Sequence, residues 1–310
     1  MMSRCAVLAV LTTAAALKQC TVFGGSGFVG KAVCKTLAAK GVAVTSVSRS
    51  GRPADAEPWM DQVDWVAADA AKDNIAAALD GAGACISCVG GFTAAKASPT
   101  GTGDIPVLFA SYSPQDQAEY RQKNGPPNEA IAKAAKEADV GQYVLVGVAA
   151  DAENGLAGGI PGYFEGKADA LDAAVRNFGA DAVVVCPHEV VEPGSARIKA
   201  VDNPFARFAR DANKAIGSVG YRGEDLVTKL SLTPPSSVDD VATVVAAAAC
   251  SDLNVDVSTR TTRRVLLDTS EGIRTLDESR EYNINARFVD GTDAIKSAAA
   301  GKVALWNSGV

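Results

Sequence analysis

The hydrophobic residues of this chain follow two alternating patterns from Gln19 onward. Short runs rich in β-branched residues predict buried strands, and Ala-rich stretches with helical spacing predict helices between them. Strands joined through single helices pair in parallel by right-handed crossovers. The pattern therefore predicts an α/β fold with a doubly wound parallel sheet. The predicted strands are Cys20–Phe23, Ala43–Val47, Asp64–Ala67, Ala84–Cys88, Tyr143–Val146 and Ala182–Cys186, and the predicted helices include Lys31–Lys40, Asn128–Ala138 and Lys167–Phe178.

Two segments interrupt this alternation. Residues Thr93–Lys123 are rich in Ser, Pro, Thr and Gly, which is typical of a long surface loop. Residues 193–235 break the rhythm with a basic amphipathic piece, Asn203–Lys214, which we interpret as a solvated helix face. We expect one Rossmann-type domain over residues 19–275, with a small substrate-side region from about residue 193 and a C-terminal extension over 276–310.

The first 18 residues have the layout of a targeting segment. Arg4 precedes an apolar stretch, Cys5–Leu11, and no acidic residue occurs before Asp55. An unprocessed N-terminal extension is the alternative interpretation. The apolar stretch is shorter than the roughly 20 residues that a membrane span needs, so we expect no transmembrane helix.

The composition narrows the possible functions. With 310 residues, 47% hydrophobic and 21% charged, the chain has ample material for a globular core. A net charge of −6 and the lack of a Lys/Arg run argue against nucleic-acid binding. The single histidine, His188, argues against a His-based metal site or a His-driven catalytic triad. Seven scattered cysteines are typical of reduced thiols, and the CxxC pair Cys85 and Cys88 lies in a strand-like run, typical of buried strand cysteines.

A glycine-rich loop follows the first predicted strand directly. Gly24, Gly27 and Gly30 have GxxGxxG spacing, and the first predicted helix comes next. A dinucleotide pyrophosphate needs glycine there, because the turn requires positive φ and the phosphates approach the backbone closely. Free N–H groups at the helix start would then face the phosphates. The loop indicates dinucleotide binding, and a bare tight turn is the alternative.

The end of the second predicted strand indicates which dinucleotide binds. An NAD-preferring enzyme offers Asp or Glu to the ribose hydroxyls here, but this chain has Ser48 and Arg49. A guanidinium can neutralise a 2′-phosphate through charge-assisted hydrogen bonds, so we predict NADP(H) as the cofactor. Exposed loop arginines are the alternative. Asp69, after the third strand, is placed to accept a hydrogen bond from the adenine amino group, or is an exposed loop residue.

Tyr163 and Lys167 have YxxxK spacing at the start of a helical stretch. At positions i and i+4 both side chains lie on one helix face. An ammonium beside a phenol stabilises the phenolate, so we expect Lys167 to lower the pKa of Tyr163 towards neutrality. Tyr163 could then exchange a proton with a carbonyl group that is reduced by hydride, while Lys167 also holds the nicotinamide ribose.

Together these motifs resemble the short-chain dehydrogenase/reductase superfamily, in its atypical or extended branch. They are most similar to an organellar group of plant plastid Rossmann proteins and a fungal mitochondrial member associated with coenzyme Q synthesis. The resemblance covers roughly residues 20–249. The segments that carry it are Val22–Gly30, Val47–Pro53, Ile86–Phe92, Gly162–Lys167 and Pro234–Ala242.

The resemblance implies a role for each matching residue. The glycine loop would hold the pyrophosphate, Arg49 the 2′-phosphate, and Tyr163 and Lys167 the reaction centre. The cofactor-binding set is then Gly24, Gly27, Phe28, Val29, Gly30, Ser48, Arg49, Asp69, Cys88, Val89 and Lys167, with Cys88 and Val89 on the ribose side.

The chain departs from the family pattern after two strands. Active members place a Ser or Thr at the end of the fifth strand to fix the substrate carbonyl, but Val146–Ala150 offers no side chain that can form a hydrogen bond. The usual Arg-Pro-Gly after the sixth strand reads Cys186-Pro187-His188.

We expect an organellar protein, plastid before mitochondrion, that reduces or oxidises a small hydrophobic substrate of the quinone or isoprenoid type. The alternative is a non-catalytic NADP(H)-bound accessory or assembly subunit of an organellar membrane protein complex.

Overall fold

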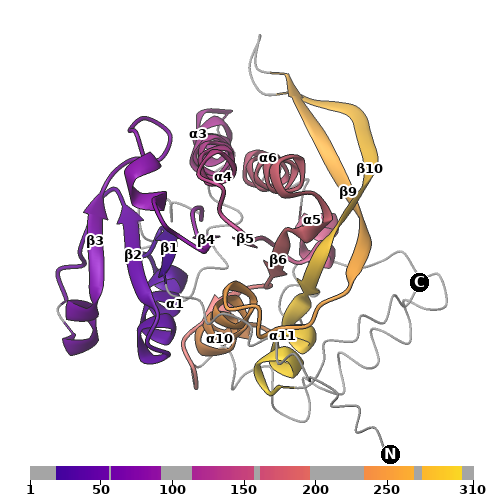
Figure 1. Ribbon diagram of the computed structural model, residues 1–310. Coiled ribbons are helices and arrows are strands. Elements are labelled where there is room, and N and C mark those ends of the chain that lie inside the picture. Colours follow the sequence, from indigo (N-terminus) through magenta and orange to yellow (C-terminus); the bar gives the residue numbers. More distant parts are fainter. Residues whose placement is uncertain are drawn as a thin grey trace, which may run out of the picture.

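The computed structural model describes residues 19–55, 57–91, 114–156, 161–195, 234–268 and 274–301. Its centre is an eight-stranded sheet of order β3-β2-β1-β4-β5-β6-β10-β9 (Figure 1). All neighbours pair in parallel except β10 and β9, which are antiparallel. The strands are β1 (Gln19–Phe23), β2 (Ala43–Ser48), β3 (Val63–Ala67), β4 (Ala84–Ser87), β5 (Gln142–Val146), β6 (Val183–Cys186), β9 (Val257–Asp268) and β10 (Arg274–Asp290).

The doubly wound parallel sheet predicted from the sequence is confirmed, and the six predicted strands match β1 to β6 within one residue at each end. The central strands β1, β4, β5 and β6 were recognisable because helices cover both faces of the sheet there, so nearly every position of these strands is buried. In β4 and β6, for example, all four residues are buried.

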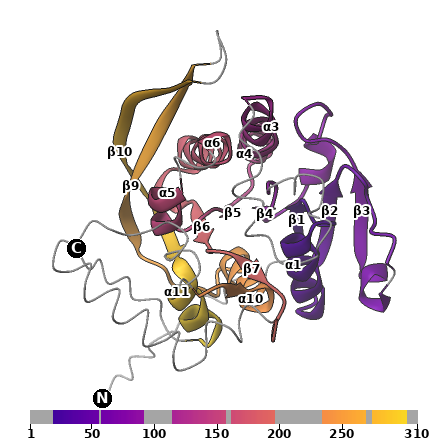
Figure 2. The ribbon, with the colours of Figure 1, turned by 180° about the vertical axis from the view of Figure 1, so that it is seen from behind.

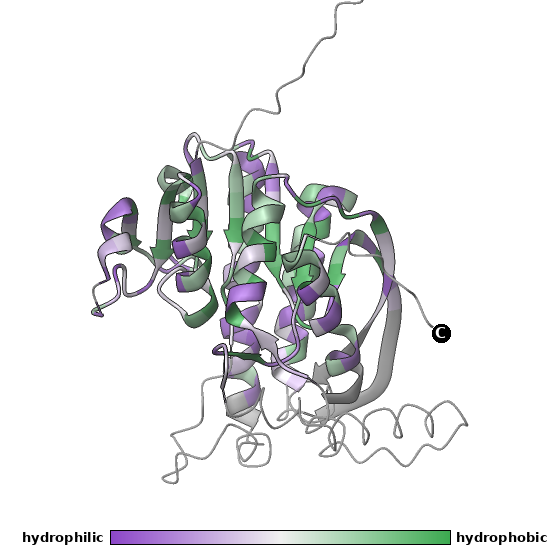
Figure 3. Ribbon diagram, turned by 90° about the horizontal axis from the view of Figure 1, so that it is seen from below, coloured by the Kyte–Doolittle hydropathy of each residue, from purple (hydrophilic) through white to green (hydrophobic). Residues whose placement is uncertain are grey.

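Two layers of helices enclose the sheet (Figures 1 and 2). The first layer holds α1 (Phe28–Ala39), α10 (Val238–Ala249) and α11 (Gly291–Ala299), and the second holds α3 (Pro114–Asn124), α4 (Pro126–Glu137) and α6 (Pro161–Phe178). Each layer packs its own cluster of buried aliphatic side chains against one sheet face. Figure 3 shows hydrophobic residues gathered on the central strands and hydrophilic ones on the outer helices.

Shorter elements complete the described chain. The short helix α5 (Ala150–Leu156) connects β5 towards α6, and a two-stranded sheet pairs β7 (Val190–Val191) with β8 (Ser236–Ser237). Three 3₁₀ turns are η1 (Pro58–Gln62), η2 (Ala76–Leu79) and η3 (Gly179–Asp181).

The interruption predicted as a loop over Thr93–Lys123 ends in a helix. From Pro114 the chain forms α3, which packs across the start of α6. The two helices meet so closely that a Cβ at Gly162 would lie 1.9 Å from the Gln117 carbonyl oxygen. Since α3 is strongly polar in sequence, this tertiary contact explains a helix that hydrophobic periodicity could not predict.

The boundary predicted at residue 275 falls inside β10. This strand pairs with β6 in the main sheet and forms a long hairpin with β9 (Figure 1). The predicted C-terminal extension therefore contains part of the domain core. Ile284, Ala286 and Phe288 are buried, and the polar residues between them alternate with them as in a strand with one core face.

The predicted targeting segment and the basic piece Asn203–Lys214 lie outside the described residues. Among the helices that the structure describes, none combines the length and apolarity needed to cross a bilayer. The six cysteines in the described ranges are free thiols, and both Cys85 and Cys186 are fully buried.

Candidate functional site

The glycine loop makes a tight cradle between β1 and α1. Gly24 has a φ of +79°, and its N–H donates to the Val47 carbonyl oxygen at 2.8 Å. A Cβ at Gly30 would lie 2.2 Å from the Gly24 carbonyl oxygen, and a Cβ at Gly24 would lie 3.0 Å from the Cys88 carbonyl group. Larger residues are excluded at both positions, because these neighbours are backbone atoms.

The cradle fits the pyrophosphate of a dinucleotide. Helix α1 begins at Phe28, and its N-cap residue Gly27 supplies no side chain that caps the helix. The first-turn N–H groups, which belong to Phe28, Val29 and Gly30, are thus left without a capping side chain. Such N–H groups and the positive end of the helix dipole favour a phosphate.

The ends of β2 and β3 place Ser48, Arg49 and Asp69 next to one another. The Ser48 carbonyl accepts a hydrogen bond from the Ala68 N–H at 3.0 Å, directly before Asp69. The Ser48 hydroxyl donates to the Gly51 carbonyl oxygen at 3.1 Å, so it also stabilises its own turn. Arg49 is exposed, and it forms no ion pair with another described side chain.

The Asp69 carboxylate already has partners within its own turn. Its carboxylate accepts a hydrogen bond from the Ala71 N–H at 3.1 Å and forms an ion pair with Lys72 at 3.4 Å. The Ala71 hydrogen bond is the main cause that lowers the pKa of Asp69, and the positive charges of Lys72 and Arg49 add to it.

The end of β4 joins the glycine loop to the Tyr–Lys pair. The Cys88 N–H donates to the Phe23 carbonyl oxygen at 2.9 Å, so Cys88 lies beside Gly24. The Val89 N–H donates to the Ser87 hydroxyl at 3.4 Å, and Gly90 follows with a φ of +133°. Cys88 and Val89 therefore lie between the glycine loop and Gly90.

Lys167 lies at the ends of β4 and β5. Its Nζ donates to the Val146 carbonyl oxygen at 3.2 Å, and a Cβ at Gly90 would lie 2.9 Å from that Nζ. Tyr163 is one turn earlier on α6, with its ring centroid 5.9 Å from Lys167 Nζ. The structure thus brings together the two residues that the YxxxK spacing predicted on one helix face.

The pKa expectation for this pair is wrong in direction for the phenol. Burial raises the pKa of Tyr163, and it lowers the pKa of Lys167 to about 8. Both shifts have the same cause, because removal from water disfavours whichever form carries the charge. The ammonium lies 5.9 Å from the ring centroid, and the burial of the phenol alone sets the direction of its pKa shift.

Two asparagines that the sequence did not single out hold the β4 end in place. Asn124, at the end of α3, accepts from the Gly91 N–H at 3.0 Å and donates to the Gly91 carbonyl oxygen at 3.2 Å. Asn128, in α4, is fully buried between the Ser87 hydroxyl at 2.5 Å and the Val89 carbonyl oxygen at 3.2 Å. No spacing or motif marks them, because their partners are more than thirty residues away in the chain.

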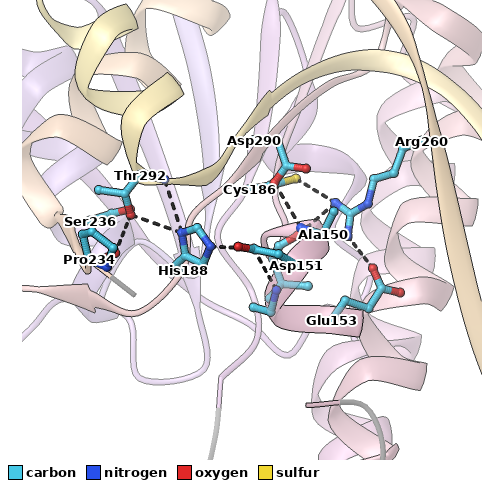
Figure 4. Close-up of polar contacts among 12 residues, drawn as sticks. Ala150, Asp151, Glu153, Cys186, His188, Pro234, Ser236, Arg260, Asp290 and Thr292 are labelled. Carbon is cyan, nitrogen blue, oxygen red and sulfur yellow. Dashed lines mark hydrogen bonds and ion pairs between the residues drawn. The ribbon is translucent and has the colours of Figure 1, made fainter. Parts of the chain in front are cut away.

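A buried ion pair, also missed from the sequence, lies beside the end of β5 (Figure 4). Arg260 of β9 pairs with Glu153 of α5, and the two side chains are 3% and 5% exposed. The guanidinium also donates to the Val148 carbonyl oxygen at 2.9 Å and contacts Cys186 Sγ at 3.3 Å. A small cavity is lined by Gly147, Val148, Glu153, Lys167, Cys186 and Arg260, among others.

His188 takes part in a second network on α5 (Figure 4). Its Nε2 lies 2.5 Å from the Asp151 carboxylate, and its Nδ1 accepts from the Thr292 N–H at 3.3 Å. Both ring nitrogens of His188 therefore have partners within the protein.

Comparison with known proteins places these features in a family. A family model described as NAD(P)H-binding matches residues 24–213. An uncharacterized chloroplastic protein of Arabidopsis thaliana, At1g32220, is 30% identical over 241 residues, which cover 76% of this chain and 72% of that protein. Component 2 of the MIOREX complex of Saccharomyces cerevisiae is 45% identical over 56 residues, covering 16% of this chain and 20% of that protein.

Solved structures with a similar fold include two oxidoreductases. A short-chain dehydrogenase/reductase from Burkholderia thailandensis has a TM-score of 0.46 at 21% identity, covering 75% of this chain and 85% of its own. The aldohexose dehydrogenase of Thermoplasma acidophilum has a TM-score of 0.47 at 14% identity, and the match covers 76% of this chain and 88% of that enzyme's chain. From the family match and the Arabidopsis relative, this chain belongs to the NAD(P)H-binding family of Rossmann-fold proteins.

Proposed function

We propose that this protein is an NADP(H)-dependent oxidoreductase that acts on a carbonyl or quinone group. The observation that carries the proposal is the continuous path from the cofactor cradle to the Tyr–Lys pair. Gly24 packs against Cys88, the chain continues to Gly90, and Gly90 adjoins Lys167 Nζ, with Tyr163 one turn away. A dinucleotide on this path would have its phosphates at the cradle and its nicotinamide end near α6.

When bound, a dinucleotide would supply or accept the hydride. Lys167 would hold the nicotinamide ribose through its ammonium, and Tyr163 would move a proton to or from the substrate oxygen. Burial raises the pKa of the Tyr163 phenol, which keeps it protonated but makes it a weaker acid, so proton donation depends on negative charge developing on the substrate oxygen. Removing the hydroxyl therefore tests the reaction itself.

The variant Tyr163→Phe keeps the ring and its packing on Phe164 but cannot donate a proton. We expect it to lose about 100-fold or more in turnover while NADPH affinity stays nearly unchanged. The assay is NADPH oxidation with a panel of quinones and isoprenoid ketones. Equal rates for wild type and Tyr163→Phe across the panel would overturn the assignment.

Arg49 carries the proposed preference for NADP(H). Its side chain is exposed and has no ion-pair partner among the described residues, so its charge is available to a 2′-phosphate. We expect NADPH to bind at least roughly ten-fold more tightly than NADH, a difference of about 1.4 kcal/mol. Titration calorimetry should show that Arg49→Ala removes this difference. Arg52→Ala is the matched control, because Arg52 already pairs with Asp61 at 2.6 Å.

The proposed substrate is small and hydrophobic, of the quinone or isoprenoid type, and the proposed location is an organelle, the plastid first. Support comes from the organellar resemblance of the motifs and from the Arabidopsis relative, which is described as chloroplastic. A fusion of residues 1–18 to a fluorescent reporter tests the location. Diffuse cytosolic fluorescence, with Met1 intact on the natural protein, would contradict it.

A second candidate is an NADP(H)-bound accessory or assembly subunit of an organellar membrane complex. The observation that favours it is the lack of a hydroxyl side chain at Val146–Ala150, where a substrate carbonyl would be held. In that case Tyr163→Phe has little effect, whereas Gly27→Val abolishes cofactor binding. The loss of bound cofactor would then lower stability by about 4 kcal/mol when free cofactor is ~1,000 times its Kd. Thermal unfolding with and without NADPH measures this loss.

A further inference from the structure

His188, the single histidine of the chain, lies where the end of β6 meets α5 and α11. Its ring is held between Asp151 of α5 and Thr292 of α11 (Figure 4). The His188 side chain is only 12% exposed, so these partners rather than water satisfy the ring. The hydrogen positions on a buried imidazole follow from what each partner can donate or accept.

The Nε2 atom of His188 carries a hydrogen. It lies 2.5 Å from a carboxylate oxygen of Asp151, and an ionised carboxylate only accepts hydrogen bonds. The same oxygen accepts the Ala152 N–H at 2.8 Å, which holds the carboxylate at the start of α5. Nε2 therefore donates to Asp151 in the neutral and in the charged ring alike.

The Nδ1 atom has a donor and an acceptor beside it, and both belong to Thr292. The Thr292 N–H donates to Nδ1 at 3.3 Å, and the Thr292 hydroxyl oxygen lies 3.2 Å from Nδ1. That hydroxyl already donates its proton to the Pro234 carbonyl oxygen at 2.7 Å, so towards His188 it can only accept. A bare Nδ1 accepts from the Thr292 N–H, whereas a protonated Nδ1 donates to the Thr292 hydroxyl oxygen.

The Thr292 hydroxyl has capacity for this second acceptor role. A hydroxyl oxygen has two lone pairs, and the Ser236 hydroxyl, 3.0 Å away, takes one of them. Thr292 and Ser236 are both buried, so water does not compete for the other lone pair. Each protonation state of His188 thus has its partners already in place.

Only the neutral ring caps helix α11. The N-cap residue of this helix, Asp290, makes no side-chain cap hydrogen bond, and its carboxylate instead accepts the Ala150 N–H at 3.1 Å. The Thr292 N–H belongs to the first turn of α11, where no carbonyl group of the helix itself can accept it. His188 Nδ1 supplies the missing acceptor. Once Nδ1 carries a proton, the Thr292 N–H faces another donor and loses its hydrogen bond.

Two carboxylates act on the ring within the described ranges. Asp151 approaches from α5, and Asp290 acts from the end of β10. Burial raises the pKa of Asp290, and the positive charges of Arg260 and His188 oppose that shift. These carboxylates favour the charged ring, whereas the positive end of the α11 dipole favours the neutral one. The acids next to these contacts in the chain are exposed, namely Glu189 and Asp293.

We propose that Asp151, His188 and Thr292 form a pH-sensitive joint between α5 and α11. In its neutral form His188 holds both helices, through Asp151 and through the Thr292 N–H. Uptake of one proton from solvent by Nδ1 keeps the contact with α5, moves the second contact to the Thr292 hydroxyl and leaves the start of α11 uncapped. Release of that proton restores the cap.

The joint lies beside the buried ion pair of Arg260. Asp151 is two residues before Glu153, and His188 is two residues after Cys186, while both Glu153 and Cys186 contact Arg260 (Figure 4). A change at His188 is therefore felt by the short helix from which Glu153 holds the guanidinium. The joint consists of contacts within the protein, so it is independent of the proposed oxidoreductase function.

The titration of one imidazole tests the joint. Because His188 is the only histidine, the imidazole signals of the untagged full chain belong to it. Nuclear magnetic resonance between pH 5 and pH 8 follows these signals together with the Thr292 amide signal. We expect both to change with the same midpoint. The protection of the Thr292 amide from hydrogen exchange, corrected for the intrinsic effect of pH, should fall about ten-fold as the ring is protonated, since one net hydrogen bond contributes roughly that factor.

Two matched variants keep one contact each. His188→Asn places an amide oxygen close to the position of Nδ1, where it accepts from the Thr292 N–H and does not titrate. It should keep the high protection of Thr292 at both ends of the pH range. His188→Gln places an amide nitrogen close to the position of Nε2, where it donates to Asp151 but leaves the Thr292 N–H without an acceptor. Its protection of Thr292 should be low throughout.

Three results would overturn the joint. The first is a Thr292 amide whose signal and protection do not change while the ring titrates. The second is a ring that keeps one protonation state from pH 5 to pH 8. The third is the same pH dependence of Thr292 protection in His188→Asn as in the wild-type protein. The first two need only the wild-type chain, so they decide the matter even where a variant does not fold.

Discussion

The ion pair between Arg260 and Glu153 makes the most direct prediction about stability. Arg260→Met keeps a long apolar side chain over the Phe288 ring but removes the guanidinium, which lies 5.7 Å from that ring centroid. Glu153 then keeps a buried carboxylate with no cation beside it, and the Val148 carbonyl loses its donor. The variant isolates the cost of leaving one buried charge unpaired.

The expected cost follows from burial. The side chains of Arg260 and Glu153 are 3% and 5% exposed, so solvent screens the pair very little. Removing one member of such a pair costs about 3–5 kcal/mol, and the lost hydrogen bond to Val148 adds about 1 kcal/mol. Since a domain is stable by roughly 5–15 kcal/mol, Arg260→Met should remove a large part of the total.

The double variant separates charge from packing. In Arg260→Met with Glu153→Met no charge remains without a partner, and two apolar side chains fill similar volume. We expect most of the loss to be recovered, because an apolar replacement of a whole buried pair is often neutral. Arg287→Met is the control, since Arg287 lies on the same hairpin but its ion pair with Asp181 is at the surface.

The assay is urea unfolding of all four proteins at pH 5 and pH 8. In Arg260→Met, burial raises the folded-state pKa of Glu153 above its unfolded value, as it already does in part in the intact pair. That contribution to stability is present below the unfolded pKa and is lost as pH rises through the folded pKa. The single variant Arg260→Met should therefore have a lower free energy of unfolding at pH 8 than at pH 5. Equal losses in the single and double variants, without pH dependence, would refute the reasoning.

Three further outcomes follow from the site. Lys167→Met should be more stable than wild type at pH 7, because burial lowers the folded-state pKa of Lys167 to about 8 and the buried ammonium opposes folding. The difference in stability between the two proteins should shrink between pH 8 and about 10.4, since a deprotonated lysine no longer opposes folding. Calorimetry across this pH range checks the prediction. Gly30→Ala should abolish NADPH binding in a titration, because its Cβ would lie 2.2 Å from the Gly24 carbonyl oxygen. Gly41→Ala is the control. A Cβ at Gly41 has open space around it, so any effect of that variant comes from the positive φ alone. Asn128→Ala should lower the free energy of unfolding in urea by about 1–3 kcal/mol, since the buried Ser87 hydroxyl loses its acceptor and the Val89 carbonyl oxygen loses its donor. A loss below about 0.5 kcal/mol would contradict the role of Asn128.

The sequence alone predicted what depends on local patterns. The central strands β1, β4, β5 and β6 follow from continuous burial, the glycine loop from steric exclusion at Gly24 and Gly30, and the shared helix face from the spacing of Tyr163 and Lys167. Each of these signals lies within a few residues of the chain, so periodicity and spacing express it directly.

The sequence could not predict how the site is held. Arg260 occupies an inward position of β9 where periodicity expects an apolar side chain, and only Glu153, 107 residues earlier, makes its burial tolerable. Likewise Asn124 has its partner in Gly91, 33 residues earlier. Nothing near either residue in the sequence marks the contact.

The pKa of Tyr163 shows the same division. Spacing put a lysine near the phenol and predicted a lowered pKa, but burial decides the sign, and burial depends on how α6 packs in the tertiary structure. The course of the chain after β5 has a similar origin, since the Gly147 and Ala149 N–H groups donate to the carbonyl oxygens of Val185 in β6 and Pro187 just after it. The residue types near a site are written in the sequence, whereas their protonation and orientation depend on desolvation and on partners that only the folded chain brings together.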